Sequence, residues 1–505
     1  MNHWLILPIL LPALVAPLIA LTMRYDIVLA RIFSLASAAA LLALALILTG
    51  IAHDGTVTSY LLGNWAAPFG IVLVLDRLSA LMLLLTAVLA VVVLLYSIGG
   101  WDKRGRHFHS LYQFQLMGIN GAFLTGDFFN LFVFFEVLLI ASYGLMVHGG
   151  GRDCVRAGVQ YVIVNLVGSS VFLIAVGLIY SVVGTLNMAD LAVKVADVPP
   201  GDRALLVTGA LLLLLVFAIK AALVPVQFWL PGTYANAPGP VAALFAVMTK
   251  VGAYSIIRMY TLAFGDGAGD LAWLAGPWLM PAALVTLLLG MVGVLASRAL
   301  GQMASFAVIG SMGTLLVAVS LFTPMAMSAA LYYLLHSTLA AASMFLIIDL
   351  VSERRTGFGG NIEVAPRFAQ MGFLACVFFL AAIAMTGMPP LSGFIGKLLI
   401  LDGVRDADWA YVIWAVILLG SLLAIVGFAR AGSTVFWKSR SMEGALKSSR
   451  RPVVLSFVAV GMLLSGTVFL TVFAGPVTAY LDKTALQIFT PSVYVEAVLG
   501  HVWDK

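Results

Sequence analysis

The sequence has little charge. Its 505 residues include only 27 Lys and Arg and 22 Asp and Glu, which is 10% of the chain, against about 25% in a soluble globular domain. Apolar residues make up 62%, and the mean hydropathy is +1.09. This composition excludes an ordinary soluble enzyme and a disordered chain. About fourteen membrane spans of roughly 20 residues each fit the length and leave no room for a soluble catalytic domain.

Cysteine is also scarce. Cys154 lies in a short basic loop and Cys376 in an apolar segment, and two such thiols are too few for a disulfide framework or a zinc site. The chain has no haem, iron–sulfur or flavin motif, so we predict no cofactor. Basic residues are not interleaved with aromatics as in nucleic-acid binders. The N-terminus lacks the Lys/Arg-rich region of a signal peptide, so we expect the first apolar run to be a span.

Apolar runs bounded by Gly, Pro or charges predict an all-α polytopic membrane protein of about fourteen spans. The runs lie near residues 4–22, 29–50, 71–98, 109–125, 128–148, 157–183, 204–229, 237–263, 271–296, 299–320, 325–350, 368–400, 408–430 and 452–474. We expect the remaining tail, from Pro476 onward, to lie at the membrane interface.

The loops between these runs divide the basic residues unequally. Alternate loops hold 17 of them, at residues 24, 31, 103–106, 152–156, 298, 354–367 and 430–451. The other loops hold five, which are Lys194, Arg203, Arg405, Lys483 and Lys505. Because cytoplasmic loops carry the excess of Lys and Arg, both termini are predicted on the non-cytoplasmic side of an inner (plasma) membrane.

Ionisable residues inside the apolar runs are the candidate functional residues, because a charge at the middle of a span costs about 2.5–3.5 kcal/mol. The candidates are Glu136, Lys220, Lys250, His336 and Lys397. One acid, three amines and one imidazole suit a proton relay better than covalent catalysis. A carboxylate near a desolvated lysine favours its charged form, so Glu136 is expected to control whether Lys220 holds a proton.

Structural interpretations of these residues stay open at this stage. The alternative for Glu136 and Lys220 is a buried ion pair that holds helices together. Lys250 would suit the cap of a helix break, and His336 a hydrogen-bonded core position. The remaining charges near span ends fit snorkelling, local pairing or a subunit interface; they are Asp76, Arg77, Asp127, Arg258 and Asp349.

Prolines predict two discontinuous helices. Pro225 lacks the amide that would bond the Ala221 carbonyl, and Pro389 and Pro390 free two further carbonyls in the same way. Transporters place broken helices at their ion sites. A weak internal repeat is also visible, since Tyr161 and Asn165 are spaced like Tyr332 and His336.

One segment carries a family resemblance. Lys220-Ala-Ala-Leu-Val-Pro-Val-Gln-Phe-Trp-Leu-Pro is followed by Ala237-Pro-Gly-Pro and by Met248-Thr-Lys-Val-Gly. It resembles the antiporter-like proton-translocating subunits shared by respiratory complex I, membrane hydrogenases and Mrp-type Na⁺(K⁺)/H⁺ antiporters. The likeness runs from about Asp76 to about Phe436. Phe134-Phe-Glu-Val-Leu-Leu-Ile-Ala-Ser-Tyr, with Gln227 and Tyr234 where respiratory members usually carry His, is most similar to the D-type subunits of the Mrp antiporters.

The resemblance implies fourteen core helices with two inverted five-helix repeats and with helices seven and twelve broken. The implied segments are 1–107 (three helices), 108–263 (first repeat), 264–436 (second repeat) and 437–505 (C-terminal helix and tail). It also assigns Glu136, Lys220, Lys250, His336 and Lys397 to the proton path.

The implied function is H⁺ transport in exchange for Na⁺ or K⁺, in a secondary transporter rather than an enzyme. The implied partners are a larger homologous A-type subunit and several small membrane subunits. A redox-driven complex of the complex I or hydrogenase type is the alternative. The sequence shows no cation site.

Overall fold

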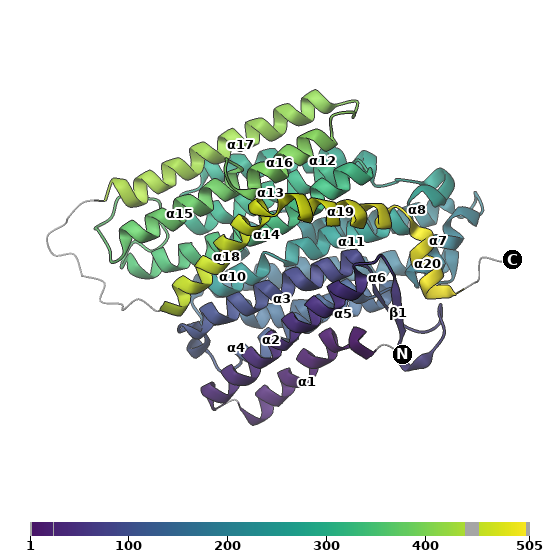
Figure 1. Ribbon diagram of the computed structural model, residues 1–505, viewed down its shortest axis with the longest axis horizontal. Helices are drawn as coiled ribbons and strands as arrows, with labels where there is room; N and C mark the ends of the chain where they lie inside the picture. Colours follow the sequence, from purple (N-terminus) through teal and green to yellow (C-terminus); the bar gives the residue numbers. More distant parts are fainter. Residues whose placement is uncertain (1–2, 24, 440–453, 501–505) are drawn as a thin grey trace.

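A computed structural model describes residues 3–23, 25–439 and 454–500, and within this part the chain is a bundle of long helices (Figure 1). Eleven described helices are long and apolar enough to cross a membrane. They include α2 (Ile27–Ala52), α3 (Arg77–Ile98), α5 (Phe128–Met146), α6 (Arg152–Val183), α8 (Arg203–Ala221), α12 (Gly276–Ala296), α13 (Leu300–Val319), α14 (Pro324–Arg354) and α18 (Val454–Val472). The other two are built from α10 (Gly239–Phe245) with α11 (Met248–Leu262), and from α17 (Ala410–Gly432) with the π-helical turn that follows it.

The three remaining predicted spans coincide with shorter helices. These are α1 (Leu7–Thr22), α4 (Phe108–Leu124) and the pair α15 (Met371–Thr386) and α16 (Ser392–Gly403). The all-α membrane fold is therefore confirmed, while the count of fourteen spans stays a prediction. The described chain begins and finishes at the same end of the bundle (Figure 1), as an even number of spans requires.

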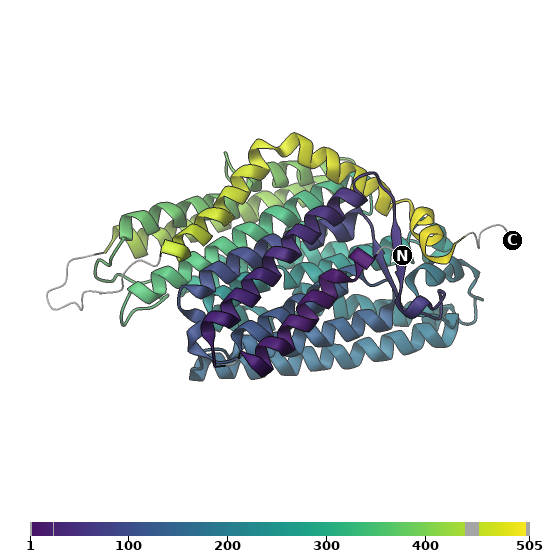
Figure 2. The same cartoon turned by 60° about the horizontal axis from the view of Figure 1, so that its bottom comes forward.

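Two features differ from the sequence prediction. The run 71–98 is not one helix, because Val72–Leu75 forms strand β2, antiparallel to β1 (Thr58–Leu61). The tail beyond Pro476 forms helices rather than an irregular segment: α19 (Ala474–Ile488) and α20 (Pro491–Leu499) follow α18 across one face of the bundle, seen in yellow in Figure 2. Its location at the membrane interface stays a prediction. Short α7 (Met188–Lys194) and α9 (Trp229–Asn236) complete the described α-helices.

The two predicted helix breaks are present and are built alike. α8 ends before Ala222 (φ 55°) and α15 before Gly387 (φ 76°), both in the left-handed conformation. Beyond each, a backbone N–H reaches back five residues, from Leu223 to the Ala218 carbonyl (2.9 Å) and from Met388 to the Ile383 carbonyl (3.1 Å). This is the Schellman arrangement that closes a helix end. The proline that follows each closure prevents the helix from continuing.

A second backbone motif also occurs twice. The bonds run from Phe128 N to Leu186 O and from Met188 N to Gly126 O (both 2.9 Å), and again from Leu300 N to Gly360 O and from Ile362 N to Arg298 O (both 2.8 Å). Five spans separate the start of α5 from the start of α13, and an odd number of crossings reverses direction. These motifs support an inverted duplication; the boundaries at 108–263 and 264–436 stay a prediction.

Buried ion pairs hold the two ends of the bundle. At one end Arg258 of α11 donates to both carboxylate oxygens of Asp76, at 2.6 and 2.9 Å, and lies over the Tyr494 ring at 5.1 Å. Asp76 also caps α3 through the Ser79 amide. Asp76 is thus paired with Arg258 rather than with its neighbour Arg77, which donates to the His53 carbonyl. These charges near the span ends have structural partners.

At the other end, Asp102 joins the α3–α4 connection to α2. Arg31 donates to its two oxygens at 2.6 and 2.8 Å, and His109 Nε2 lies 3.2 Å from Oδ2. Burial opposes ionisation of Asp102, but the hydrogen bonds from His109 and Arg31 outweigh it and lower the pKa of the carboxyl to about 2.

We expect Asp102→Asn to lower the free energy of unfolding of the protein by about 3 kcal/mol at pH 7, because breaking a buried pair leaves Arg31 uncompensated. The folded-state pKa lies below the ordinary value of 3.8, so the difference from wild type should persist down to about pH 4 and shrink between about pH 4 and pH 2. Denaturant unfolding at several pH values measures this. Asp408→Asn, on an exposed carboxyl, is the matched control. An equal loss in both variants would contradict the role of the pair.

Candidate functional site

Glu136 and Lys220 are linked through α6 in the described structure. The Ser169 hydroxyl donates to the Glu136 carboxylate, and Lys220 Nζ donates to Asn165 Oδ1 at 2.8 Å. Asn165 and Ser169 are four residues apart, so they lie one turn apart on the same face of the helix. The acid and the amine are therefore each held by one of two neighbouring polar side chains.

Lys220 lies at the first helix break. Its Nζ is 5.7 Å from the centre of the Phe135 ring. It also lines a small cavity of about 10 Å³, together with Asn165, Tyr161 and Trp229, which is roughly the space that one water requires. Trp229 Nε1 donates to the Ile219 carbonyl at 3.0 Å and so satisfies one acceptor at the broken end of α8. The end of this helix thus presents an amine to a water-sized space that is lined mainly by apolar side chains.

Lys250 is fully buried in α11, with an exposed fraction of 0%. Its hydrogen bond to Thr249 is a long one, 3.4 Å from Nζ to Oγ1. Gly252, two residues on, lies so close to the end of α8 that a β-carbon there would be 2.6 Å from the Ala221 nitrogen. This glycine allows α11 to pack directly against the turn that carries Lys220.

The second helix break positions His336 and Lys397. His336 Nδ1 lies 2.8 Å from Ser392 Oγ, at the start of α16. Lys397 Nζ donates to the Thr386 carbonyl at 2.7 Å and to Ser421 Oγ at 2.8 Å. Pro390 has no amide hydrogen to donate to the Thr386 carbonyl four residues earlier, and Lys397 satisfies that carbonyl instead. His336 lies within electrostatic range of both Lys397 and Lys250.

The five predicted residues therefore fall into three groups. Glu136 and Lys220 are each bonded to a side chain of α6, Lys250 lies buried beside the end of α8, and His336 and Lys397 both lie at the second break. Sequence reasoning missed the neutral partners Ser169, Ser392 and Ser421, because serine is common in apolar helices. Asn165 stands out in the sequence as the counterpart of His336 in the weak repeat. A side-chain amide inside an apolar run was the signal that could have identified it as a partner of Lys220.

The described part of the chain contains no cluster of metal ligands. No group of three or more His, Cys, Asp or Glu residues there is arranged to hold a metal ion.

Tyr234 and Gln227 occupy two positions at which respiratory relatives were expected to carry His. Tyr234 donates its hydroxyl to the Phe245 carbonyl at 2.7 Å, and Gln227 has a buried Oε1 without a hydrogen-bond partner among the described residues.

Asn165 is a candidate positioning residue, since it accepts the hydrogen bond of Lys220 Nζ. We expect Asn165→Leu to reduce proton transport by the assembled complex about tenfold, because the lysine loses its alternative partner. A double-mutant cycle with Glu136→Gln checks this, since residues in one network show non-additive effects. If the two substitutions act additively, Asn165 does not work through the pair.

Taken together, the helical bundle, the two broken spans and the buried ionisable residues define a polytopic membrane protein with the features of an ion-translocating subunit. Residues 125–424 match the family model described as "NADH:quinone oxidoreductase/Mrp antiporter, TM". The chain belongs to this family.

Individual relatives match over almost the whole chain. The D subunit of a probable K⁺/H⁺ antiporter from Rhizobium meliloti (strain 1021) is 43% identical, with 99% of this chain and 98% of the relative covered. The D subunit of a Na⁺/H⁺ antiporter from Bacillus subtilis (strain 168) is 38% identical, with 99% and 100% covered. A chain of the Mrp complex from Dietzia sp. DQ12-45-1b superimposes with a TM-score of 0.87 at 28% identity, with 99% and 100% covered.

Proposed function

We propose that this chain is the D-type subunit of a multisubunit Na⁺ or K⁺/H⁺ antiporter and that it moves the protons. The observation that carries the proposal is the placement of buried amines at both helix breaks, with Lys250 beside the first and His336 at the second. Relatives named as D subunits of K⁺/H⁺ and Na⁺/H⁺ antiporters support the assignment. No covalent step is involved, and the chain acts as part of a secondary transporter.

In this mechanism the charge on one amine controls proton binding at the next. Glu136 stabilises the protonated form of Lys220 when the two approach, and Asn165 and Ser169 hold them in the separated state. A positive charge near a buried amine disfavours protonation of that amine. A proton arriving at Lys220 would therefore favour release from Lys250 toward His336, and Lys397 would control the second half of the path.

The proposed setting is a hetero-oligomer in the cell membrane. Its other members would be a larger homologous A-type subunit and several small membrane subunits. Both termini would face the non-cytoplasmic side, because the loops rich in Lys and Arg would remain in the cytoplasm.

Reconstitution of the whole complex tests the function. Proteoliposomes with an imposed pH gradient should lose that gradient when Na⁺ or K⁺ is added to the outside. Vesicles containing a complex that lacks this chain should not respond. Cation addition without proton movement in the intact complex would overturn the proposal.

A redox-driven proton pump is the second candidate, because the matching family model also covers NADH:quinone oxidoreductase. The chain shares its fold with both kinds of complex, so its partners distinguish them. Mass spectrometry of the purified complex should find other antiporter subunits; NADH-oxidising or hydrogenase subunits would instead favour the redox assignment.

A further inference from the structure

A carboxyl group outside the five proposed proton-path residues lies near the end of α14. Asp349 is half-buried, and its Oδ2 accepts two hydrogen bonds, from the Tyr96 hydroxyl at 2.6 Å and from Trp101 Nε1 at 2.7 Å. Its Oδ1 makes no hydrogen bond to a described residue. The nearby basic residues at 103–106 and 354–367 place this end of the bundle on the predicted cytoplasmic side.

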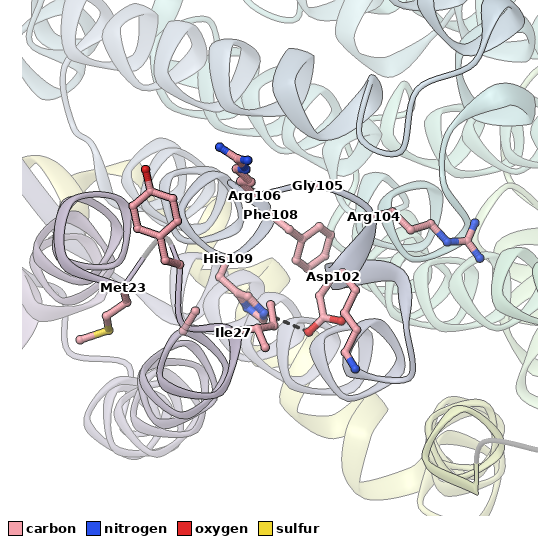
Figure 3. A pocket seen from close by; sticks show the side chains of 11 residues that line it. Met23, Ile27, Asp102, Arg104, Gly105, Arg106, Phe108 and His109 are labelled. Carbon is pink, nitrogen blue, oxygen red and sulfur yellow. Dashed lines mark hydrogen bonds and ion pairs between the residues drawn. The ribbon is translucent and has the colours of Figure 1, made fainter.

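Two neighbouring carboxylates at this end are paired with arginine. Asp102 accepts from Arg31 and lies against His109, which Figure 3 shows turned toward it. Glu353 pairs with Arg104. Because an arginine stays charged at physiological pH, it favours the ionised form of its partner. Asp102 and Glu353 are therefore held as carboxylates.

The hydrogen-bond donors to Asp349 are neutral. A phenol and an indole N–H can bond to one oxygen of either a carboxylate or a carboxylic acid, because the protonated acid keeps acceptor capacity. The other oxygen, Oδ1, is then the position for the proton. Asp349 can therefore gain or lose a proton without breaking an ion pair or a hydrogen bond between helices.

The charged side chains near Asp349 act in opposite directions. Glu353, one turn further along α14, opposes a negative charge on Asp349, whereas Arg104 of the α3–α4 connection favours it, and these two are bonded to each other. Helix α3 contributes the phenol of Tyr96. Helix α10, which packs against this part of α14, has no ionisable side chain.

Asp349 lies against the start of the span that carries Lys250. Gly239 begins α10, and a β-carbon there would be 2.8 Å from Asp349 Oδ1. Lys250 is eleven positions further along the same span, or about 16 Å at 1.5 Å per residue. Asp349 also shares α14 with His336, thirteen positions away. The carboxyl group is thus at the outer end of both spans that carry the middle of the proposed path.

A buried hydroxyl lies between Asp349 and Lys250. A turn at 246–247 separates α10 from α11, and the Phe245 carbonyl just before it accepts the Tyr234 hydroxyl at 2.7 Å. The Tyr234 ring also lies 6.0 Å from the ring of Phe345 on α14. Phe345 is one turn from Asp349, and Phe245 is five positions before Lys250. Tyr234 therefore divides the distance between the carboxyl group and the amine.

We propose that Asp349 is the cytoplasmic proton-binding group of this subunit, which exchanges protons with cytoplasmic water and transfers them to and from Lys250 by way of water and the Tyr234 hydroxyl. Only O–H and N–H bonds form and break, since the proton leaves Oδ1 as it binds the next acceptor. The inference rests on the proposed transport function. It adds an entrance to a path whose five residues lie within the spans.

Asp349→Asn in the reconstituted whole complex tests this role. The amide oxygen can still accept from Tyr96 and Trp101, so assembly and thermal stability should match wild type, but the side chain can no longer bind a proton. We expect cation/proton exchange to fall about tenfold, less than the roughly 100-fold effect of a positioned proton-transfer group, because water can partly replace an entrance group. Formate, a small weak acid, should partly restore exchange when compared with the chloride salt of the same cation.

Two further variants separate proton binding from helix packing. Tyr96→Phe removes a hydrogen bond to Asp349 but leaves the carboxyl group, so stability should fall while exchange stays near the wild-type rate. Glu353→Gln removes a carboxylate one turn away that is paired with Arg104, and it should leave exchange unchanged.

The same assay distinguishes the failure of this inference from the failure of the transport function. Exchange by Asp349→Asn at the wild-type rate would overturn the inference while the transport function stands. An equal loss in Asp349→Asn and Tyr96→Phe, without rescue by formate, would also overturn it, because Asp349 would then only link α14 to α3. Absence of exchange in the wild-type complex would overturn both.

Discussion

Lys220→Met is expected to reduce cation/proton exchange by the assembled complex at least about 100-fold, the lower end of the effect of removing a proton-transfer group. Methionine retains the length of the side chain but cannot bind a proton. Lys220 Nζ is the group bonded to Asn165 at the first helix break, so its loss should interrupt the first half of the path. Dissipation of a pH gradient in proteoliposomes measures the effect.

Two further variants test whether the effect is specific to the proton path. Glu136→Gln should also lower exchange strongly, because the amide cannot supply the charge that tunes Lys220, although it can still accept the Ser169 hydrogen bond. Lys438→Met removes an exposed lysine and should have no effect. If Glu136→Ala and Lys220→Ala both leave exchange intact in a fully assembled complex, the assigned roles are wrong.

Lys250→Met is expected to abolish exchange to a similar degree while leaving the stability of the complex equal or higher. Lys250 is completely buried, and its hydrogen bond to Thr249 is long, at 3.4 Å. An amine in such a site is costly, and replacing buried charges with apolar side chains of similar volume is often neutral or stabilising. Exchange in proteoliposomes and thermal unfolding of the same preparation give the two readouts.

Arg258→Met provides the contrast on the same helix. Arg258 is paired with Asp76 at 2.6 Å, so its removal leaves a buried carboxylate uncompensated and should cost about 3–5 kcal/mol of stability. Lys250 and Arg258 are thus expected to show opposite signatures. If Lys250→Met destabilises the complex as strongly as Arg258→Met does, Lys250 is a structural residue.

Much of the architecture was accessible from the chain alone. Long apolar runs identify spans because every backbone amide in a lipid core must be bonded within the segment. The two breaks followed from Pro225 and Pro390, since proline cannot continue a helix. The five ionisable residues stood out for the same reason that makes them functional candidates, namely the cost of a charge in an apolar surrounding.

Other features depended on contacts between distant segments. In the sequence, strand β2 cannot be distinguished from the apolar span that follows it, because the strand and the span are both rich in Val and Leu. Asp76 lies beside Arg77 in the chain, but its partner is Arg258, 182 positions away. The serine partners could not be selected from sequence, because serine in spans has no distinctive periodicity.

The sequence by itself determined the membrane environment, the approximate spans, the two helix breaks and the identity of the buried ionisable residues. Each of these depends on local composition or on the chemistry of a single residue. Only the tertiary structure decided that Lys220 bonds to Asn165 and Glu136 to Ser169, and that Lys397 satisfies the Thr386 carbonyl. Hydrogen bonds between helices depend on how those helices pack, and packing is a property of the whole bundle rather than of any one segment.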